Sequence, residues 1–134
     1  MVEWGVARLL IADDEQDIAT MLKILLEKDG HSVALAHDGA EALAALGLEP
    51  EDARARLPDA AILDVMMPRV DGYAVCARMF ESERTRAVPV IMLTARGAMK
   101  DLHARTPNVA AHLDKPFDPK ALRDLLAEML KADR

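Results

Sequence analysis

Short apolar runs and amphipathic segments alternate along the chain. The runs have strand length, are rich in Val, Ile, Leu and Ala, and cover about residues 7–12, 33–35, 60–64, 88–93 and 109–113. Between them, apolar side chains recur three and four positions apart, as on one face of a helix. This alternation predicts an α/β fold in which a parallel sheet is covered by its crossover helices.

Five helices are expected, one after each strand. The first can end at Gly30 and carries an apolar face made of Ile18, Met21, Leu22, Leu25 and Leu26. The second and third are expected over about 38–46 and 72–82, and the last begins after Asp118, which can cap it. A short fourth helix is expected over about 96–105, because Pro107 cannot continue it. The polar residues 47–58 predict a loop.

Polar side chains mark the ends of four strands. Asp13 and Asp14 follow the first strand, Asp64 ends the third, Thr94 follows the fourth and Lys115 follows the fifth. Because the carboxyl ends of parallel strands form the ligand crevice of such a sheet, we expect these side chains to meet there. Considered singly, each has a plainer interpretation: a helix cap for the acidic pair, a solvated lysine and a strand-end threonine.

Together these side chains suit a divalent cation and a phosphoryl group. Neighbouring carboxylates repel one another, and magnesium relieves that repulsion while preferring oxygen ligands. Asp14, Asp64 and the backbone carbonyl of Met66 are therefore candidate ligands. Asp64 is the candidate nucleophile, since a carboxylate can form an aspartyl phosphate. Lys115 would neutralise the charge of the product, and Thr94 would donate a hydrogen bond to it.

Composition narrows the class of protein. A chain of 134 residues is expected to form one domain with its own core. The net charge of −6 argues against a nucleic-acid surface on this chain, and no apolar run reaches the length of about 18 residues that spans a bilayer. The single cysteine, Cys76, permits no internal disulfide and fits a cytoplasmic protein. Because the chain ends at Arg134, after the last expected helix, we expect no output domain.

The chain resembles the receiver domain of two-component response regulators, of the chemotaxis-receiver type. The resemblance covers nearly the whole chain and rests on five motifs in the family's order: Ile11-Ala12-Asp13-Asp14-Glu15, Ile62-Leu63-Asp64-Val65-Met66-Met67-Pro68, Asp71-Gly72, Leu93-Thr94-Ala95 and Lys115-Pro116-Phe117. It implies a flavodoxin-like, doubly wound, five-stranded parallel sheet in the order 2-1-3-4-5 with five helices. Residues 1–134 would form a single receiver domain with its core over about 6–131.

The resemblance also implies a function. The domain would accept a phosphoryl group from a histidine kinase or histidine phosphotransfer protein in the presence of Mg²⁺. A downstream protein would read the resulting change of shape. At matching positions the family's roles are phosphoacceptor for Asp64, metal ligands for Asp13, Asp14, Asp64 and the carbonyl of Met66, switch hydroxyl for Thr94, and phosphoryl contact for Lys115, with a cis Lys115–Pro116 bond.

Three departures from the family fall in this chain. His112 stands where the family usually has Tyr or Phe, so it is the candidate second switch residue beside Thr94. The family's Gly-Ala pair before the fifth strand is absent from residues 106–111, and the loop over 47–58 is longer than usual. The first two lie on the face through which the family generally signals.

Two other classes of function compete with this one. A phosphohydrolase of the haloacid-dehalogenase type would need a second Asp two residues after the nucleophile, where this chain has Met66. A pseudo-receiver would bind its partner without phosphorylation; the complete acid set argues against it, whereas His112 keeps this alternative open. We therefore expect a phosphorylatable switch that catalyses only its own phosphorylation and dephosphorylation, and no enzyme that turns over an external substrate.

Overall fold

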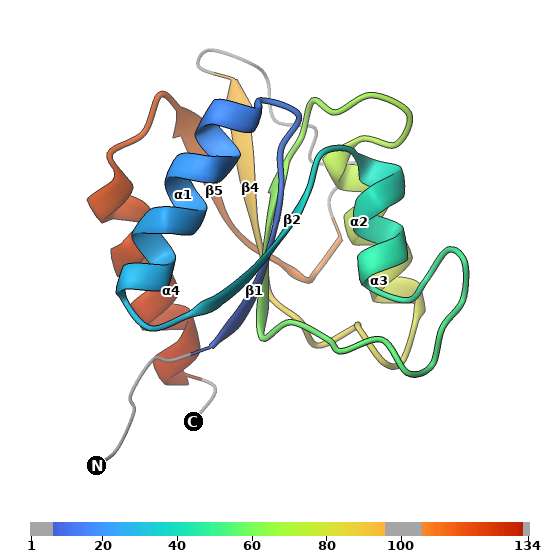
Figure 1. The fold of residues 1–134 in the computed structure, drawn as a ribbon. Helices are drawn as coiled ribbons and strands as arrows, with labels where there is room; N and C mark the ends of the chain where they lie inside the picture. Colours follow the sequence, from blue (N-terminus) through green and yellow to red (C-terminus); the bar gives the residue numbers. More distant parts are fainter. Residues whose placement is uncertain (1–6, 96–105, 133–134) are drawn as a thin grey trace.

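The computed structural model describes residues 7–95 and 106–132, and its centre is one five-stranded parallel sheet (Figure 1). The strands are β1 (Arg8–Ala12), β2 (Ser32–Ala36), β3 (Ala60–Asp64), β4 (Val90–Ala95) and β5 (Val109–Lys115). Their order is β2-β1-β3-β4-β5, and every neighbouring pair is parallel. The predicted fold class and strand order are confirmed.

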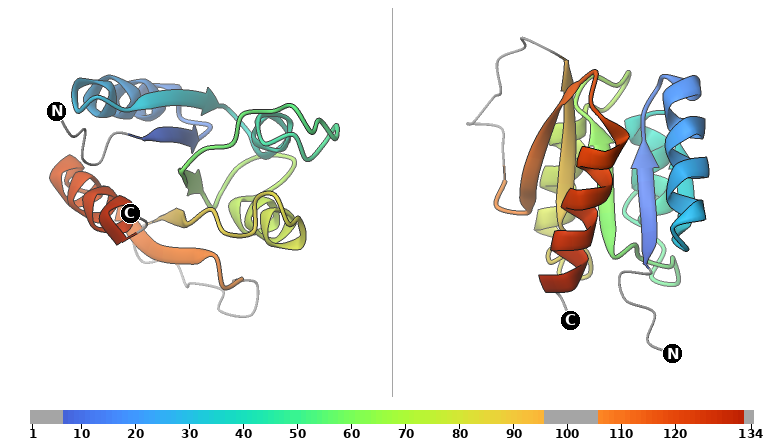
Figure 2. Two further views of the ribbon diagram at one scale, coloured as in Figure 1. Left: turned by 90° about the horizontal axis from the view of Figure 1, so that it is seen from below. Right: turned by 90° about the vertical axis from the view of Figure 1, so that its left-hand side faces the viewer.

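Two helices cover each face of the sheet (Figure 2). On one face lie α1 (Gln16–Lys28) and α4 (Pro119–Ala132), and on the other lie α2 (Gly39–Ala45) and α3 (Gly72–Glu81). The described residues thus contain four helices, and the fifth expected one, over 96–105, lies outside them. None of these helices is long and apolar enough to cross a membrane.

The core lies in two layers, because successive side chains of a strand point to opposite faces of the sheet. Ile11, Ile62 and Leu93 pack with Leu22 and Leu126 in the layer under α1 and α4. The layer under α2 and α3 is made by strand residues and by small or flexible helix residues: Leu10, Leu63, Met92, Ala42, Val75 and Met79. All five residues of β3 are buried, so this central strand is covered on both faces and Asp64 stands at its buried end.

Two features differ from the sequence prediction. Met21 on α1 is 44% exposed, so the buried face of this helix is narrower than the spacing of its apolar residues predicts. The ladder between β4 and β5 also continues through Thr94–Asp114 and Ala95–Lys115. The polar residues therefore lie within these strands rather than after them, because parallel pairing uses backbone groups whatever the side chain.

Candidate phosphoryl and metal site

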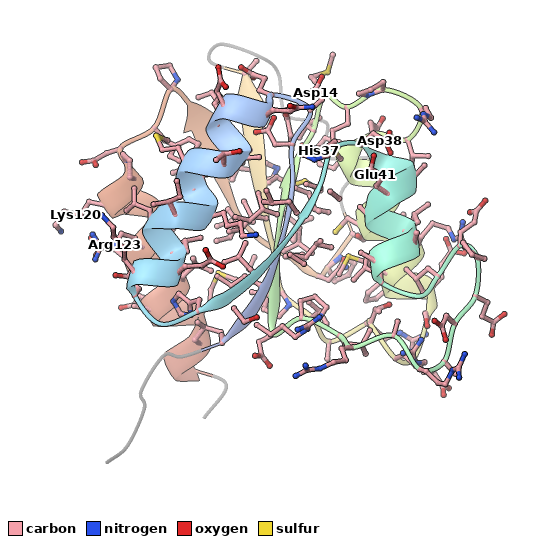
Figure 3. The ribbon with its side chains drawn as sticks, in the orientation of Figure 1. Asp14, His37, Asp38, Glu41, Lys120 and Arg123 are labelled. Atoms are coloured by element: carbon pink, nitrogen blue, oxygen red, sulfur yellow. The ribbon has the colours of Figure 1, made fainter. Side chains whose placement is uncertain are left out.

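Three carboxylates meet at the carboxyl edge of the sheet, where β1 and β3 end side by side. Asp13, Asp14 and Asp64 each present an oxygen atom, and these oxygens lie within 4.8 Å of one another. Asp13 is fully buried and Asp64 is 4% exposed, whereas Asp14 is exposed to solvent. Figure 3 shows Asp14 at this edge, with His37 and Asp38 following β2 nearby. Such a set of oxygens is typical of a site for a hard divalent cation.

Lys115 brings a positive charge to these acids from the end of β5. Its Nζ atom lies 3.0 Å from Asp13 Oδ2 and 3.0 Å from Asp64 Oδ2. It also lies 3.0 Å from Glu15 Oε1, a third partner that sequence reasoning did not assign. The Lys115–Pro116 peptide bond is cis, as the resemblance implies. The lysine side chain is only 15% exposed, and its ion pairs with the buried Asp13 and Asp64 form largely out of water, whereas the Glu15 side chain is 57% exposed.

The charges in this pocket shift one another's pKa values. Burial and the nearby Asp13 carboxylate raise the pKa of Asp64 to about 6, against the hydrogen bonds from Lys115 and the Met66 amide, which favour its charged form. Burial alone would lower the pKa of Lys115, but its hydrogen bonds to Asp13, Glu15 and Asp64 outweigh burial and raise it. Lys115 therefore stays protonated, while Asp64 is deprotonated only above mildly acidic pH.

The backbone around the acidic pair holds Asp13 in place. Its amide donates to the Ala36 carbonyl at 3.1 Å, and its Oδ1 atom accepts the Glu15 amide at 2.9 Å. Glu15 itself is the N-cap residue of α1, and its side chain makes no capping hydrogen bond. The helix-cap interpretation of Asp13-Asp14 is therefore wrong, because the Asp13 carboxylate bonds the backbone ahead of the helix and faces Lys115.

The Asp71-Gly72 turn brings the start of α3 close to the backbone of Asp64. The Asp71 side chain caps α3 by accepting the Ala74 amide at 2.8 Å, and the Gly72 amide donates to the Val65 carbonyl at 2.9 Å. A Cβ atom on Gly72 would lie 2.5 Å from the Asp64 carbonyl oxygen. Only glycine permits this close approach, and the turn consequently fixes the backbone of Asp64.

The two candidate switch residues are each held by a polar neighbour. The Thr94 hydroxyl, 4% exposed, donates to Asp114 Oδ1 across the β4–β5 pair. The Tyr73 hydroxyl on α3 lies 3.0 Å from His112 Nε2 on β5. His112 is half-buried beneath α3 and is more than a plain exposed strand residue.

A hollow of about 480 Å³ opens beside the pocket, between the start of α1 and the loop that follows β5. Apolar side chains line most of it, with charged groups at its edge: Ile18, Met21, Ala95, Pro116, Phe117, Glu15 and Lys115. The exposed side chain of Met21 thus belongs to a concave surface next to the acids.

The fold and this pocket define a doubly wound α/β domain with a carboxylate–lysine site at the carboxyl edge of its sheet. The family model of the response regulator receiver domain matches residues 9–127, and the chain belongs to that family. It is a signalling domain of two-component systems, phosphorylation-accepting as a class.

Relatives and solved structures agree with this assignment. The chain is 36% identical over 126 residues to the DNA-binding dual master transcriptional regulator RpaA of Synechocystis sp., covering 92% of this chain and 49% of that protein. It is 39% identical over 123 residues to the response regulator MprA of Mycobacterium avium, covering 91% of this chain and 49% of that protein. The chain thus spans about half the length of these curated relatives.

Two solved structures show the same fold. One is a putative response regulator from Chloroflexus aurantiacus, with a TM-score of 0.80, 35% identity, and 93% of this chain and 98% of that one covered. The other is the receiver domain of the sensor histidine kinase PA1611 from Pseudomonas aeruginosa, which holds a magnesium ion in its active-site cleft. It has a TM-score of 0.79 and 27% identity, and the match covers 93% of this chain and 98% of that one.

The structure brings four of the predicted site residues into one pocket: Asp13, Asp14, Asp64 and Lys115. It places Thr94 on the adjacent strand, bonded to Asp114. The roles of these residues, of the Met66 carbonyl and of His112 stay predictions. Sequence reasoning missed Glu15 and Asp114, although each is next to a residue that it did select.

Proposed function

We propose that this domain accepts a phosphoryl group on Asp64 from a histidine kinase or histidine phosphotransfer protein, with Mg²⁺, and signals by a change of conformation. The observation that carries the proposal is the triple contact of Lys115 with Asp13, Asp64 and Glu15 at the end of the buried strand β3. A receiver of this kind is a switch that modifies itself, so no external substrate is turned over.

The transfer balances at Asp64. One carboxylate oxygen attacks the phosphorus of a phosphohistidine, so a P–O bond forms as the P–N bond breaks. The leaving imidazole nitrogen keeps the electron pair and takes up a proton. The attacking group must be the carboxylate, and Asp64, with its pKa at about 6, is mostly in this form at neutral pH. Lys115, already 3.0 Å from Asp64 Oδ2, is placed to pair with the new phosphoryl oxygens.

The donor set fits magnesium. Asp13, Asp14 and Asp64 offer hard carboxylate oxygens at one point, and burial together with the Asp13 carboxylate raises the pKa of Asp64, so a cation there would favour its charged form. These three side chains and the carbonyl of Met66 would hold the ion, with waters completing its shell. A bound Mg²⁺ supplies positive charge that stabilises the oxygens of a transferring phosphoryl group.

The partners follow from the family and the charge. A kinase or phosphotransfer protein would bring its histidine to the carboxyl edge, and a downstream protein would bind the altered face near Thr94 and His112. The acidic chain, with its net charge of −6, is not proposed to bind nucleic acid itself, although the Synechocystis relative carries DNA binding in its name. We propose a cytoplasmic location, where such kinases supply phosphoryl groups.

Intact mass spectrometry after incubation with Mg²⁺ and acetyl phosphate tests the proposal. The wild type should gain a single phosphoryl adduct, and Asp64→Asn should gain none. Asp17→Asn, which changes an exposed aspartate in the first turn of α1, is the matched control and should behave as the wild type. An adduct that survives in Asp64→Asn would overturn the assignment. A wild type without an adduct would favour the pseudo-receiver, which binds its partner unphosphorylated.

A further inference from the structure

In this structure the Thr94 hydroxyl already donates its proton in a hydrogen bond to Asp114. Thr94 and Asp114 are register partners on the parallel strands β4 and β5, so their side chains lie on the same face of the sheet. The hydroxyl donates to Asp114 Oδ1, and the threonine side chain is buried whereas the aspartate is exposed. The acceptor is an ionised carboxylate on an edge strand, which makes this a charge-assisted hydrogen bond.

A hydroxyl has one proton to donate. If Thr94 donates to a phosphoryl oxygen on Asp64, as the proposed function requires, it must first leave Asp114. The two anions therefore compete for one donor, and the competition exists only because an acid directly precedes Lys115. Neighbouring positions show no comparable conflict, since Ala95 pairs with Lys115 and Leu93 pairs with Asp64.

We propose that Asp114 is a positioning residue that holds Thr94 in its resting orientation and so opposes switching. The proposal rests on the proposed function, because it needs a phosphoryl group on Asp64 that recruits Thr94. Phosphorylation then does two things at once: it draws the hydroxyl inward, and it frees the Asp114 side chain from Thr94 on the edge strand β5. Loss of the Asp114 carboxylate should make the phosphorylated conformation easier to reach.

Binding of beryllofluoride with Mg²⁺, measured by titration calorimetry, tests this proposal because beryllofluoride mimics a phosphoryl group. Asp114→Ala should bind it about three- to tenfold more tightly than the wild type, which is the range for a partly exposed, charge-assisted hydrogen bond. Asp114→Asn keeps an acceptor oxygen without the charge and should give a smaller gain. Since Asp114 is exposed, both variants should fold.

A plain charge effect predicts the same sign, because removing any nearby acid favours an anion. The double-mutant cycle with Thr94→Val separates the two explanations. If Asp114 acts through the hydroxyl, Asp114→Ala should have no effect in the Thr94→Val background and should regain its effect with Thr94→Ser. An equal gain in all three backgrounds would mean that Asp114 acts by charge alone, and it would overturn the proposal. If Asp114→Ala alone, with Thr94 unchanged, does not bind beryllofluoride more tightly than the wild type, the proposal is overturned as well.

A second measurement needs no phosphoryl group. In the resting wild type, three-bond NMR couplings should show one χ1 rotamer for Thr94, whereas Asp114→Ala should show averaging between rotamers. Suppose that the wild type fails to bind beryllofluoride but the Thr94 rotamer responds to Asp114→Ala. This result would overturn the proposed function, and with it the proposal that Asp114 opposes switching. Normal wild-type binding with Thr94 unaltered in Asp114→Ala would overturn this inference alone.

Discussion

At the residue scale, the surroundings of Asp64 disfavour the charged form of its carboxyl group. Its carboxylate ends a strand with all five residues buried, close to the Asp13 carboxylate, and burial is the largest cause of its raised pKa. Lys115 offsets this only in part. In the proposed function Asp64 reacts as a charged nucleophile, and its charge is only partly neutralised until a cation or a phosphoryl group completes the pocket.

The raised pKa of Asp64 predicts a pH-dependent gain of stability in Asp64→Asn. The folded protein holds this proton up to about pH 6, against an ordinary pKa of 3.8, so it binds more protons than the unfolded chain between these values. Stability consequently falls as pH rises through this window, and the penalty is complete above it. In metal-free buffer at pH 7.5, Asp64→Asn should be more stable by about 1–2 kcal/mol after allowance for solvent screening.

Urea denaturation of both proteins at pH 4 and pH 7.5 would measure this effect. At pH 4 the Asp64 carboxyl is largely protonated when folded, and the difference between the two proteins should mostly vanish. A difference that is the same at both pH values would show that the gain comes from packing instead of charge.

Asp14 should matter more for the metal than for the fold. It is exposed, yet its carboxylate lies with those of Asp13 and Asp64, so Asp14→Asn should weaken Mg²⁺ binding by at least about tenfold, or about 1.4 kcal/mol. Because one repelling charge is removed, the metal-free protein should become slightly more stable. Calorimetry and thermal melts would measure both, with Asp17→Asn as the control for net charge. Unchanged affinity would remove Asp14 from the ligand set.

At the scale of elements, the turns at the carboxyl edge are packed more tightly than their sequences show. The Asp38 side chain caps α2 by accepting the Glu41 amide at 2.8 Å, and it also pairs with Arg69 at 3.1 Å. Arg69 lies in the turn after β3 and has a positive φ of 71°, an uncommon conformation for arginine. The start of α2 is thus connected by an ion pair to the turn that follows Asp64.

Gly39→Ala tests how closely the start of α2 packs against the turn after β3. A Cβ atom on Gly39 would lie 1.9 Å from the Val70 carbonyl oxygen, so backbone must move to admit it. We expect a loss of about 2–3 kcal/mol in the free energy of unfolding, as for other overpacked sites. Helix propensity alone predicts the opposite sign, a gain of up to about 1 kcal/mol. Urea denaturation distinguishes them, and a stabilised variant would show that α2 does not rest on this turn.

At the scale of the whole molecule, polar contacts join α3 to the edge strand and to the turn before it. Tyr73 contacts His112, and the Asn108 side chain donates to the Cys76 carbonyl at 3.1 Å. Thr94 adds a polar bond between β4 and β5 through Asp114. The other half of the sheet, around β1 and β2, packs on α1 through apolar contacts such as those of Leu22 and Leu26. Polar bonds can exchange partners, so the β4–β5 half is where we expect the molecule to change.

Hydrogen exchange with and without beryllofluoride and Mg²⁺ tests this division of the molecule. Changes in protection should concentrate in residues 106–113 and at the end of β4, because Thr94 and His112 lie there. The amides of β2 and of the middle of α1 should be unaffected. Changes spread evenly, or absent from β5, would mean that this receiver signals through another face and that His112 is not a switch residue.

The sequence predicted the chemistry of the site well because strand ends are local features. Four of the five apolar runs end in a chemically distinctive side chain, and parallel pairing brings such ends to one edge of the sheet. Asp13, Asp14, Asp64 and Lys115 could therefore be selected together. Helix faces were predicted less well: Met21 has the spacing of a core residue, but its side chain is 44% exposed and lines a hollow.

The sequence by itself determined the strand order, through the family motifs, and the residues that gather at the carboxyl edge. Only the tertiary structure decided which of them touch. The bonds of Lys115 to Glu15 and of Thr94 to Asp114 join residues 100 and 20 positions apart, and they depend on register and side-chain direction. Hydrophobic patterning sets which face of an element is buried, but it leaves open which polar atoms pair at its ends. Which polar atoms pair depends on their distances to within a few tenths of an ångström, and these distances are set only when the sheet is assembled.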